Sequence, residues 1–233
     1  MSRYVQAHSG LSLKGVADYG RNTQAIEGKM ERRLKTYLAG PEVFLPNAIE
    51  IGLRKKQLCA DFGFEGLFPF DNEISLTDQK TRIGRLIYRA NVAMIQEADF
   101  GIANLTPFRG PSADVGTAFE LGMLRGLGKP VFGYTNEVED LLDRLKQSGT
   151  ALDPVEKVWR DVNGITVEDF GNADNLMIDS AFAEQGHPII RHAAKPEERF
   201  RDLTGFEACL RIAVGVFKLA GSPLSRRVQR ARR

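Results

Sequence analysis

The residues best suited to chemistry lie in one segment, ADFGIANLTPFRGPSADVGTAFELGMLRGLGKP, residues 98–130. This segment joins a predicted strand, a polar loop with glycine and proline, and a predicted helix, which is the order that a ligand site needs. Glu120 stands inside the helix. Its neighbours three and four positions away are Gly116, Thr117, Met123 and Leu124. No basic residue on the helix can therefore pair with the carboxylate. This makes Glu120 a candidate for chemistry, and a solvated helix glutamate is the alternative.

Two residues before Glu120 bear on what it can do. Gly116 is one helical turn earlier and removes a side chain where a ligand could approach, at a cost of about 1 kcal/mol in helix propensity relative to alanine. Asp114 precedes Glu120 by six residues, so the two can share a cleft only if Asp114 lies at the helix entrance. The helix dipole and free N–H groups stabilise a carboxylate there, so Asp114 could also serve only to start the helix.

The loop TPFRGPSA carries two large side chains, Phe108 and Arg109. A loop in this place should overhang the ends of the strands, where ligands bind. The ring of Phe108 would suit stacking on a nucleobase, and an ordinary turn is the alternative.

Short apolar runs alternate with amphipathic stretches along the chain. We expect strands at 36–39, 67–70, 100–105 and 130–134, and helices at 49–63, 82–97, 114–127, 138–147 and 206–219. The first of these helices carries Ile49, Leu53 and Leu58. Strands that alternate with helices predict a doubly wound parallel sheet, Rossmann-like or flavodoxin-like, with helices on both faces. Loops after the first three strands would then converge on a ligand.

Composition bounds the organisation and the partners. With 233 residues and 42% hydrophobic residues, one α/β domain at 34–220 is expected, with a polar extension at 1–33 and a basic, disordered tail at 221–233. Lys and Arg total 32 against 30 Asp and Glu, so a nucleic-acid partner is not expected. No stretch approaches the roughly 20 apolar residues of a membrane span, so we expect a cytoplasmic protein without membrane attachment. Cys59 and Cys209 are expected as reduced, buried thiols.

Five pieces of the sequence together resemble the nucleoside 2-deoxyribosyltransferase family over roughly residues 35–180. They are Tyr37-Leu-Ala-Gly-Pro-Glu-Val-Phe44, Pro69-Phe-Asp-Asn-Glu73, Asn91 to Leu105, PFRGPSADVGTAFELG and Asn175-Leu-Met177. The resemblance implies that Glu120 is a nucleophile that attacks C1' of a deoxyribose. It also implies that Asp114 and Asn175 hold the 5'-hydroxyl of the sugar, with Asn175 reaching in from a neighbouring subunit of a homo-oligomer.

The resemblance assigns further residues to the pocket. Tyr37 and Gly40 would line its floor near Glu120, and the loop of Asp71 would lie near the base. Some relatives have a catalytic Asp at the position of Asn91, and an amide cannot donate an acidic proton. Asp71 is therefore our candidate for the acid that protonates the leaving base, with loop capping as its alternative role.

The sequence favours a reaction without a metal or an organic cofactor. His187 and His192 lack acidic or cysteine partners at metal-ligand spacing, and no phosphate-binding glycine motif for ATP or a dinucleotide is present. The substrates implied are small 2'-deoxynucleosides and nucleobases. Because related 5'-phosphate hydrolases have a serine at the position of Asp114, we expect free nucleosides and not 5'-monophosphates. Hydrolysis and nucleotide binding without turnover remain as alternatives to transfer.

Overall fold

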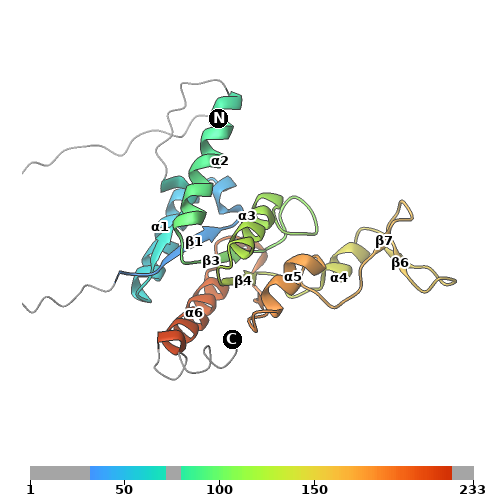
Figure 1. The fold of residues 1–233 in the computed structure, drawn as a ribbon. Helices are drawn as coiled ribbons and strands as arrows, with labels where there is room; N and C mark the ends of the chain where they lie inside the picture. Colours follow the sequence, from blue (N-terminus) through green and yellow to red (C-terminus); the bar gives the residue numbers. More distant parts are fainter. Residues whose placement is uncertain (1–31, 72–79, 222–233) are drawn as a thin grey trace, which may run out of the picture.

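A five-stranded parallel sheet organises the protein in the computed structural model, which describes residues 32–71 and 80–221 (Figure 1). The strand order is β2-β1-β3-β4-β8. The strands are β1 (Lys35–Ala39), β2 (Glu65–Leu67), β3 (Phe100–Asn104), β4 (Val131–Thr135) and β8 (Ile190–Arg191). With its first strand between β2 and β3, the sheet has the flavodoxin-like order, and the predicted fold class is confirmed.

Helices cover both faces of the sheet. On one face, α1 (Ala48–Asp61) and α6 (Thr204–Gly221) contribute to a core with the side chains of alternate strand residues. On the other face, α2 (Lys80–Glu97), α3 (Val115–Gly126) and α5 (Leu176–Ala183) do the same. The two cores divide the strands by the period of two, since Leu38 belongs to the first and Tyr37 to the second.

On the face that carries α3 and α5, glycine residues let the helices pack close to the strands. A Cβ atom at Gly101 on β3 would lie 2.3 Å from a methyl carbon of Leu124 on α3. A Cβ atom at Gly133 on β4 would lie 2.7 Å from the ring of Phe182 on α5. Glycine at these positions lets both helices pack directly on the strands, and α3 carries Glu120.

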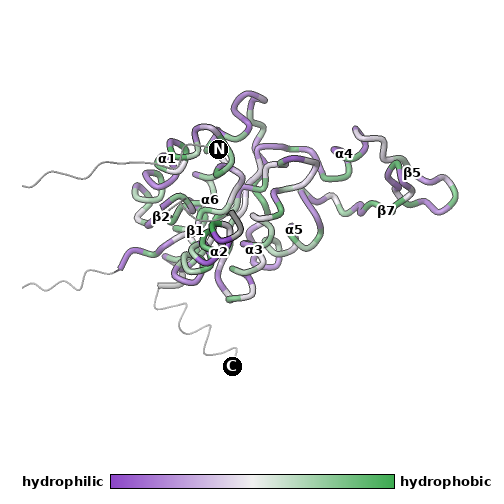
Figure 2. The backbone as a smooth tube through the Cα atoms, turned by 90° about the horizontal axis from the view of Figure 1, so that it is seen from above, coloured by the Kyte–Doolittle hydropathy of each residue, from purple (hydrophilic) through white to green (hydrophobic). Residues whose placement is uncertain are grey.

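A small antiparallel unit extends from this body. It contains β5 (Ala151–Leu152), β6 (Trp159–Arg160) and β7 (Thr166–Val167), and both views show it projecting from the layered part (Figures 1 and 2). Short elements complete the fold: η1 (Pro41–Phe44), η2 (Pro69–Asp71), α4 (Leu141–Lys146) and η3 (Pro196–Glu198).

Several predicted boundaries need correction. The strand expected at 67–70 is wrong, because β2 ends at Leu67 and η2 begins at Pro69. Proline has no N–H for the ladder and its fixed φ suits a turn. The helix expected at 138–147 is shorter and begins at Leu141. On α1, Ile49 and Leu53 are each 61% exposed, so the helix buries a different face.

Three parts of the chain lie outside the described residues. They hold residues 1–31, 72–79 and 222–233, and therefore most of the expected extension and tail and the Asn72 and Glu73 of the family motif. Within the described part, no helix is long and apolar enough to cross a membrane.

Candidate active site

Glu120 on α3 contacts Tyr37, the middle residue of β1. The hydroxyl of Tyr37 donates a hydrogen bond of 2.6 Å to Glu120 Oε1. The side-chain amide of Asn91 on α2 approaches the same oxygen at 3.5 Å. Tyr37 points to this face because of strand alternation, and α3 comes close enough because of Gly101. Three elements therefore place donors and a carboxylate together beside the carboxyl end of the sheet.

The electrostatics of Glu120 differ from those of a solvated glutamate. The pKa of Glu120 is raised to about 7, mainly because the side chain is buried. The hydrogen bond from Tyr37 lowers this pKa, the charge of Asp114 raises it, and the Asn91 amide lowers it. Burial and the charge of Glu120 also raise the pKa of Tyr37, so its hydroxyl remains a donor. Among the described residues, no lysine or arginine forms an ion pair with Glu120. Its side chain is partly buried and bonded to Tyr37, which differs from the environment of a fully solvated helix glutamate.

Asp114 lies at the entrance of α3, which is the position that it needs in order to share a cleft with Glu120. It is the N-cap, and its Oδ2 accepts a hydrogen bond of 3.1 Å from the backbone N–H of Thr117. The structure thus gives Asp114 its capping role, and no hydrogen bond from the described residues reaches its Oδ1. A Cβ atom at Gly116 would lie 2.9 Å from Asp114 Oδ2. Glycine at 116 thus gives room to the capping carboxylate.

Gly40 directly follows β1 and lies beside a buried charge that the sequence did not reveal. A Cβ atom at Gly40 would lie 2.0 Å from the carboxylate of Glu42. Glu42 and Lys55 are each 1% exposed and form an ion pair. Glu42 Oε1 also accepts hydrogen bonds from Asn104 Nδ2 at 2.8 Å and from the Tyr134 hydroxyl at 3.2 Å. This network ties the ends of β1, β3 and β4 together.

Phe108 and Arg109, on the loop after β3, belong to an aromatic cluster. Phe108 is half-buried and stacks on Phe44 with ring centroids 5.4 Å apart, while Phe200 meets its ring edge-on at 5.8 Å. Arg109 lies over both stacked rings, at 4.6 Å from Phe44 and 4.7 Å from Phe108. Its backbone φ of 58° is in the left-handed region. Phe44, which the sequence analysis did not single out, is the exposed ring at 52%.

Asp71 is engaged within its own turn. Its Oδ1 accepts a hydrogen bond of 2.8 Å from Lys56 Nζ, and its Oδ2 accepts one of 3.0 Å from the backbone N–H of Phe68. These contacts fit the loop-capping alternative. Within residues 32–71 and 80–221, no hydrogen bond joins Asp71 to Glu120 or Asn91.

Asn175 caps a different helix. It is the N-cap of α5, where its Oδ1 accepts a hydrogen bond of 3.0 Å from Met177 N and its Nδ2 donates one of 3.1 Å to Glu168. Asn175 is exposed, and so is the apolar Met177 at 74%. The side chain is therefore available to a ligand or to another chain.

The histidines do not form a metal site with these residues. His192 Nε2 lies 2.9 Å from Asp202 Oδ2, and His187 packs on the ring of Phe132. Over the ranges that the structure describes, no group of three potential metal ligands occurs.

Comparison with known proteins identifies the family. The model of the nucleoside 2-deoxyribosyltransferase family matches residues 36–177, more than half of the chain. Uncharacterized protein C191.05c of Schizosaccharomyces pombe is 33% identical over 163 residues, which cover 64% of this chain and 77% of that protein.

A solved deoxyribosyltransferase structure resembles this fold. The 2-desoxiribosyltransferase of Leishmania mexicana has a TM-score of 0.56 and 26% identity, and the match covers 78% of this chain and 97% of that one. The 2-deoxyribosyltransferase of Bacillus psychrosaccharolyticus has a TM-score of 0.39 and 26% identity, over 47% and 81% of the two chains, which is too distant to support a statement about this fold. From the family match and the first structure, this chain belongs to the nucleoside 2-deoxyribosyltransferases, a family of pentosyl-transferring enzymes.

Proposed function

We propose that this enzyme transfers the 2-deoxyribosyl group between the nucleobases of 2'-deoxynucleosides, through a covalent intermediate on Glu120 and with retention at C1'. The observation that carries the proposal is the environment of Glu120. Its carboxylate is held by Tyr37 at 2.6 Å, has no basic partner among the described residues, and has a pKa raised by burial to about 7. A perturbed carboxylate at the carboxyl end of a parallel sheet is typical of a catalytic group.

The hydrogen bonds of Glu120 support a division between its two oxygens. The Tyr37 hydroxyl and the Asn91 amide both contact Oε1. Oε2 accepts no hydrogen bond from the described residues, so it is the oxygen that faces the sugar in our proposal. A pKa of about 7 leaves close to half of the carboxylate ionised at neutral pH. The fixed donors orient the ionised group without a salt bridge that would have to break.

The reaction then proceeds in two displacements. Glu120 Oε2 forms a bond to C1' as the bond from C1' to the base nitrogen breaks, and the electron pair and a proton go to the departing base. A second base attacks C1' from the face that the first one left and returns its N–H proton to the group that protonated the first base. The bond from C1' to Oε2 breaks with its electron pair going to Oε2, which regenerates the carboxylate and retains the configuration. The carboxylate also stabilises the oxocarbenium-like transition state.

Protonation of the leaving base needs a separate donor. Asn91 offers an amide and no acidic proton. Asp71 remains our candidate, in competition with the turn-capping role that its contacts with Lys56 and Phe68 favour. Asp71→Asn can keep the capping hydrogen bond from Phe68 N through its remaining oxygen, and it loses the contact with Lys56. If Asp71 is the acid, this variant should lose activity most with poor leaving bases, whereas a capping role predicts equal losses for all bases.

The aromatic cluster is the proposed seat of the base. Phe108 is already covered by Phe44 and Phe200, whereas the Phe44 ring is half exposed. A base that stacks on the cluster would therefore meet Phe44, with Phe108 and Arg109 holding that ring in place.

The charge at Asp114 favours free nucleosides as substrates. An ionised carboxylate accepts a hydrogen bond from a 5'-hydroxyl and has no proton for a phosphate oxygen. At about 4 Å and an effective dielectric of about 20, one pair of like charges costs about 4 kcal/mol, or close to a thousandfold in affinity. Arg109 could offset this, but its guanidinium lies over Phe44 and Phe108.

Asp114→Ser tests this assignment. The variant should have a lower kcat/KM for 2'-deoxynucleosides and should use 2'-deoxynucleoside 5'-monophosphates relatively better than the wild type does. A wild type that prefers the monophosphate would show that Asp114 does not bind the 5' end.

Exchange between bases tests the proposed activity itself. The protein is incubated with deoxyinosine, with and without adenine, and nucleosides and free bases are separated. Transfer predicts deoxyadenosine with adenine and little hypoxanthine without it. Hypoxanthine at the same rate in both samples would instead favour hydrolysis. Binding without turnover in both the wild type and Glu120→Gln would favour a binding module.

We also propose a homo-oligomer in which Asn175 completes the site of a neighbour. The exposed Met177 beside Asn175 supports an intermolecular contact. Asp174 binds the backbone N–H of Ala113, which brings the same segment close to Asp114 of its own chain. Mixing Glu120→Ala with Asn175→Ala subunits distinguishes the two arrangements. Recovered activity supports sharing between subunits, and no recovery from an assembled mixture supports a role within one chain.

A further inference from the structure

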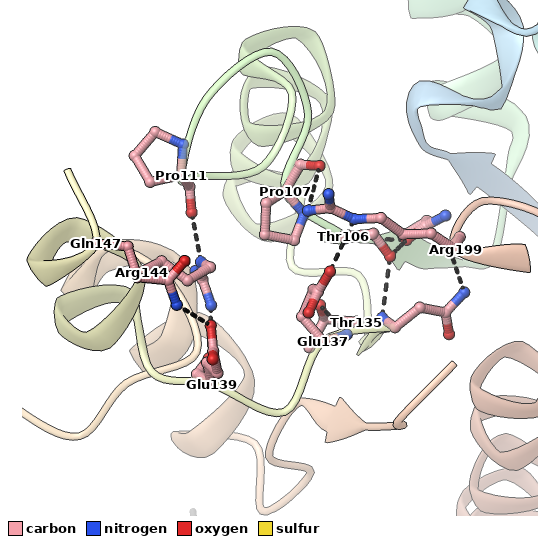
Figure 3. Close-up of polar contacts among 11 residues, drawn as sticks. Thr106, Pro107, Pro111, Thr135, Glu137, Glu139, Arg144, Gln147 and Arg199 are labelled. Carbon is pink, nitrogen blue, oxygen red and sulfur yellow. Dashed lines mark hydrogen bonds and ion pairs between the residues drawn. The ribbon is translucent and has the colours of Figure 1, made fainter. Parts of the chain in front are cut away.

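The loop that follows β3 is held at both ends by buried or half-buried arginines (Figure 3). Arg199 donates to the carbonyl of Pro107 at 3.1 Å. Arg144 on α4 is only 8% exposed and donates from Nε to the carbonyl of Pro111 at 2.7 Å. Its Nη2 also donates to the carbonyl of Ala173 at 2.6 Å. Arg144 thus joins the loop just before α3 to the segment just before α5.

A buried carboxylate joins the same two segments. Asp174 is fully buried, and its Oδ2 accepts a hydrogen bond of 2.7 Å from Ala113 N. Its Oδ1 accepts one of 2.7 Å from Asn175 N and a further one from the hydroxyl of Ser112. The carbonyls of the two segments therefore bind Arg144, and their N–H groups bind Asp174. We call this arrangement the Arg144–Asp174 clamp.

The clamp gives hydrogen-bond partners to both kinds of backbone group, carbonyls and N–H groups. Buried backbone groups need partners, and here one cation supplies donors while one anion supplies acceptors. Burial lowers the pKa of Arg144, and the charge of Asp174 acts against this effect. The segments it joins end at Asp114 and at Asn175, the N-caps of α3 and α5. In the part of the chain that the structure describes, the side chains of Arg144 and Asp174 make no hydrogen bond to Glu120.

We infer that Arg144 and Asp174 are positioning residues, which hold the N-caps Asp114 and Asn175 where each can bind the 5'-hydroxyl of a sugar, Asp114 in the site of its own chain and Asn175 in the site of a neighbour. The inference rests on the proposed function, in which these two N-caps bind that hydroxyl. Each clamp residue acts through the backbone of the segment before an N-cap, so its loss moves the cap and not the nucleophile. Weakening the clamp should therefore reduce recognition of the 5'-hydroxyl more than it reduces the rest of catalysis.

A substrate pair gives the readout. The kcat/KM for base exchange is measured with 2'-deoxyadenosine and with 2',5'-dideoxyadenosine, or with thymidine and 5'-deoxythymidine if the enzyme uses pyrimidines. The ratio of the two values reports the use of the 5'-hydroxyl. Because both substrates are measured on the same enzyme sample, a loss of folded protein lowers both rates equally and leaves the ratio unchanged.

The wild type should prefer the 5'-hydroxyl substrate by about ten- to a hundredfold, as expected for a hydrogen bond to a charged acceptor. Asp114→Ala should bring the ratio close to one. Arg144→Met and Asp174→Asn should each reduce the wild-type ratio by at least about threefold, and the milder Arg144→Lys should lie in between. Arg199→Met is the matched control, since Arg199 holds the same loop at its other end and should leave the ratio unchanged.

Other outcomes overturn the inference in distinct ways. A wild-type ratio in Arg144→Met and Asp174→Asn, with Asp114→Ala close to one, would show that the clamp serves only folding. A ratio that falls equally in Arg199→Met would show that the whole loop, and not the clamp, sets the 5' site. A wild type that exchanges bases equally well with and without the 5'-hydroxyl would show that neither the clamp nor the loop sets a 5' site. A wild type that does not exchange bases would overturn the proposed function itself.

Discussion

Removal of the Tyr37 hydroxyl should make the enzyme dependent on alkaline pH. Tyr37→Phe keeps the ring that packs in the core and deletes the hydrogen bond of 2.6 Å to Glu120. A hydrogen bond to a charged group contributes about 1.5–3 kcal/mol, and about 1.4 kcal/mol corresponds to one pH unit. The pKa of Glu120, about 7 in the wild type, should therefore rise by about one to two pH units.

The consequence is a loss of activity that depends on pH. Since the ionised carboxylate is the nucleophile, its population at pH 7 should fall from about a half to between about a tenth and a hundredth, which lowers kcat/KM about 5- to 50-fold. Activity should recover as the pH rises through the new pKa. The assay is kcat/KM for base exchange from pH 5 to 10, which reports the free enzyme.

Tyr88→Phe is the control for this experiment. Tyr88 is 54% exposed on α2, and its ring lies 6.5 Å from that of Phe119, the neighbour of Glu120 in the chain. Its variant should keep the wild-type pH profile. An acid limb that stays in place in Tyr37→Phe, or moves to lower pH, would refute the role of the hydroxyl in stabilising the ionised Glu120.

Three further predictions concern stability and binding. Because the pKa of Glu120 is raised from 4.5 to about 7, the folded state keeps a proton on this residue at pH values where the unfolded state has released it. The stability of the wild type therefore falls as the pH rises from 4.5 to about 7. Glu120→Gln should therefore be more stable than the wild type by at most about 3 kcal/mol at pH 8 and equally stable at pH 4, by denaturant unfolding. Gly116→Ala should raise KM for the donor nucleoside severalfold, because the added Cβ displaces the Asp114 carboxylate. The melting temperature should change little, because the gain in helix propensity and the loss of the cap are each about 1 kcal/mol and offset one another. Lys55→Met should destabilise the fold by about 3–5 kcal/mol in the same measurement, and adding Glu42→Gln should recover most of that loss; a double variant as unstable as the single one would contradict the ion-pair account.

The main layers of the fold could be predicted from the sequence because they follow from periodicity. The apolar runs of β1, β3 and β4 and the amphipathic α2 and α3 appear close to where the pattern placed them. The position of Asp114 at the start of α3 also follows from local capping preferences. The face of α1 was harder to predict, because Ile49 and Leu53 are exposed while Lys55 is buried.

The parts that the sequence could not provide depend on contacts between distant residues. Lys55 is buried because it pairs with Glu42, which also accepts hydrogen bonds from Asn104 and Tyr134, and no local sequence pattern predicts that pair. The contact of Tyr37 with Glu120 joins residues 83 positions apart. The two-residue strands β5, β6 and β7 are too short for a period of two to be visible. The role of Phe44 in the aromatic cluster likewise depends on Phe108 and Arg109 from another loop.

The central claim is that Glu120 becomes covalently attached to the sugar. Wild-type enzyme is mixed with a 2'-deoxynucleoside, quenched in acid, digested and analysed by mass spectrometry, with Glu120→Gln as the control. A covalent intermediate predicts a deoxyribosyl group on the peptide that contains Glu120, which disappears when an acceptor base is added before the quench and is missing in Glu120→Gln. A deoxyribosyl group on another residue, or an enzyme that exchanges bases while Glu120 is replaced by alanine, would contradict it.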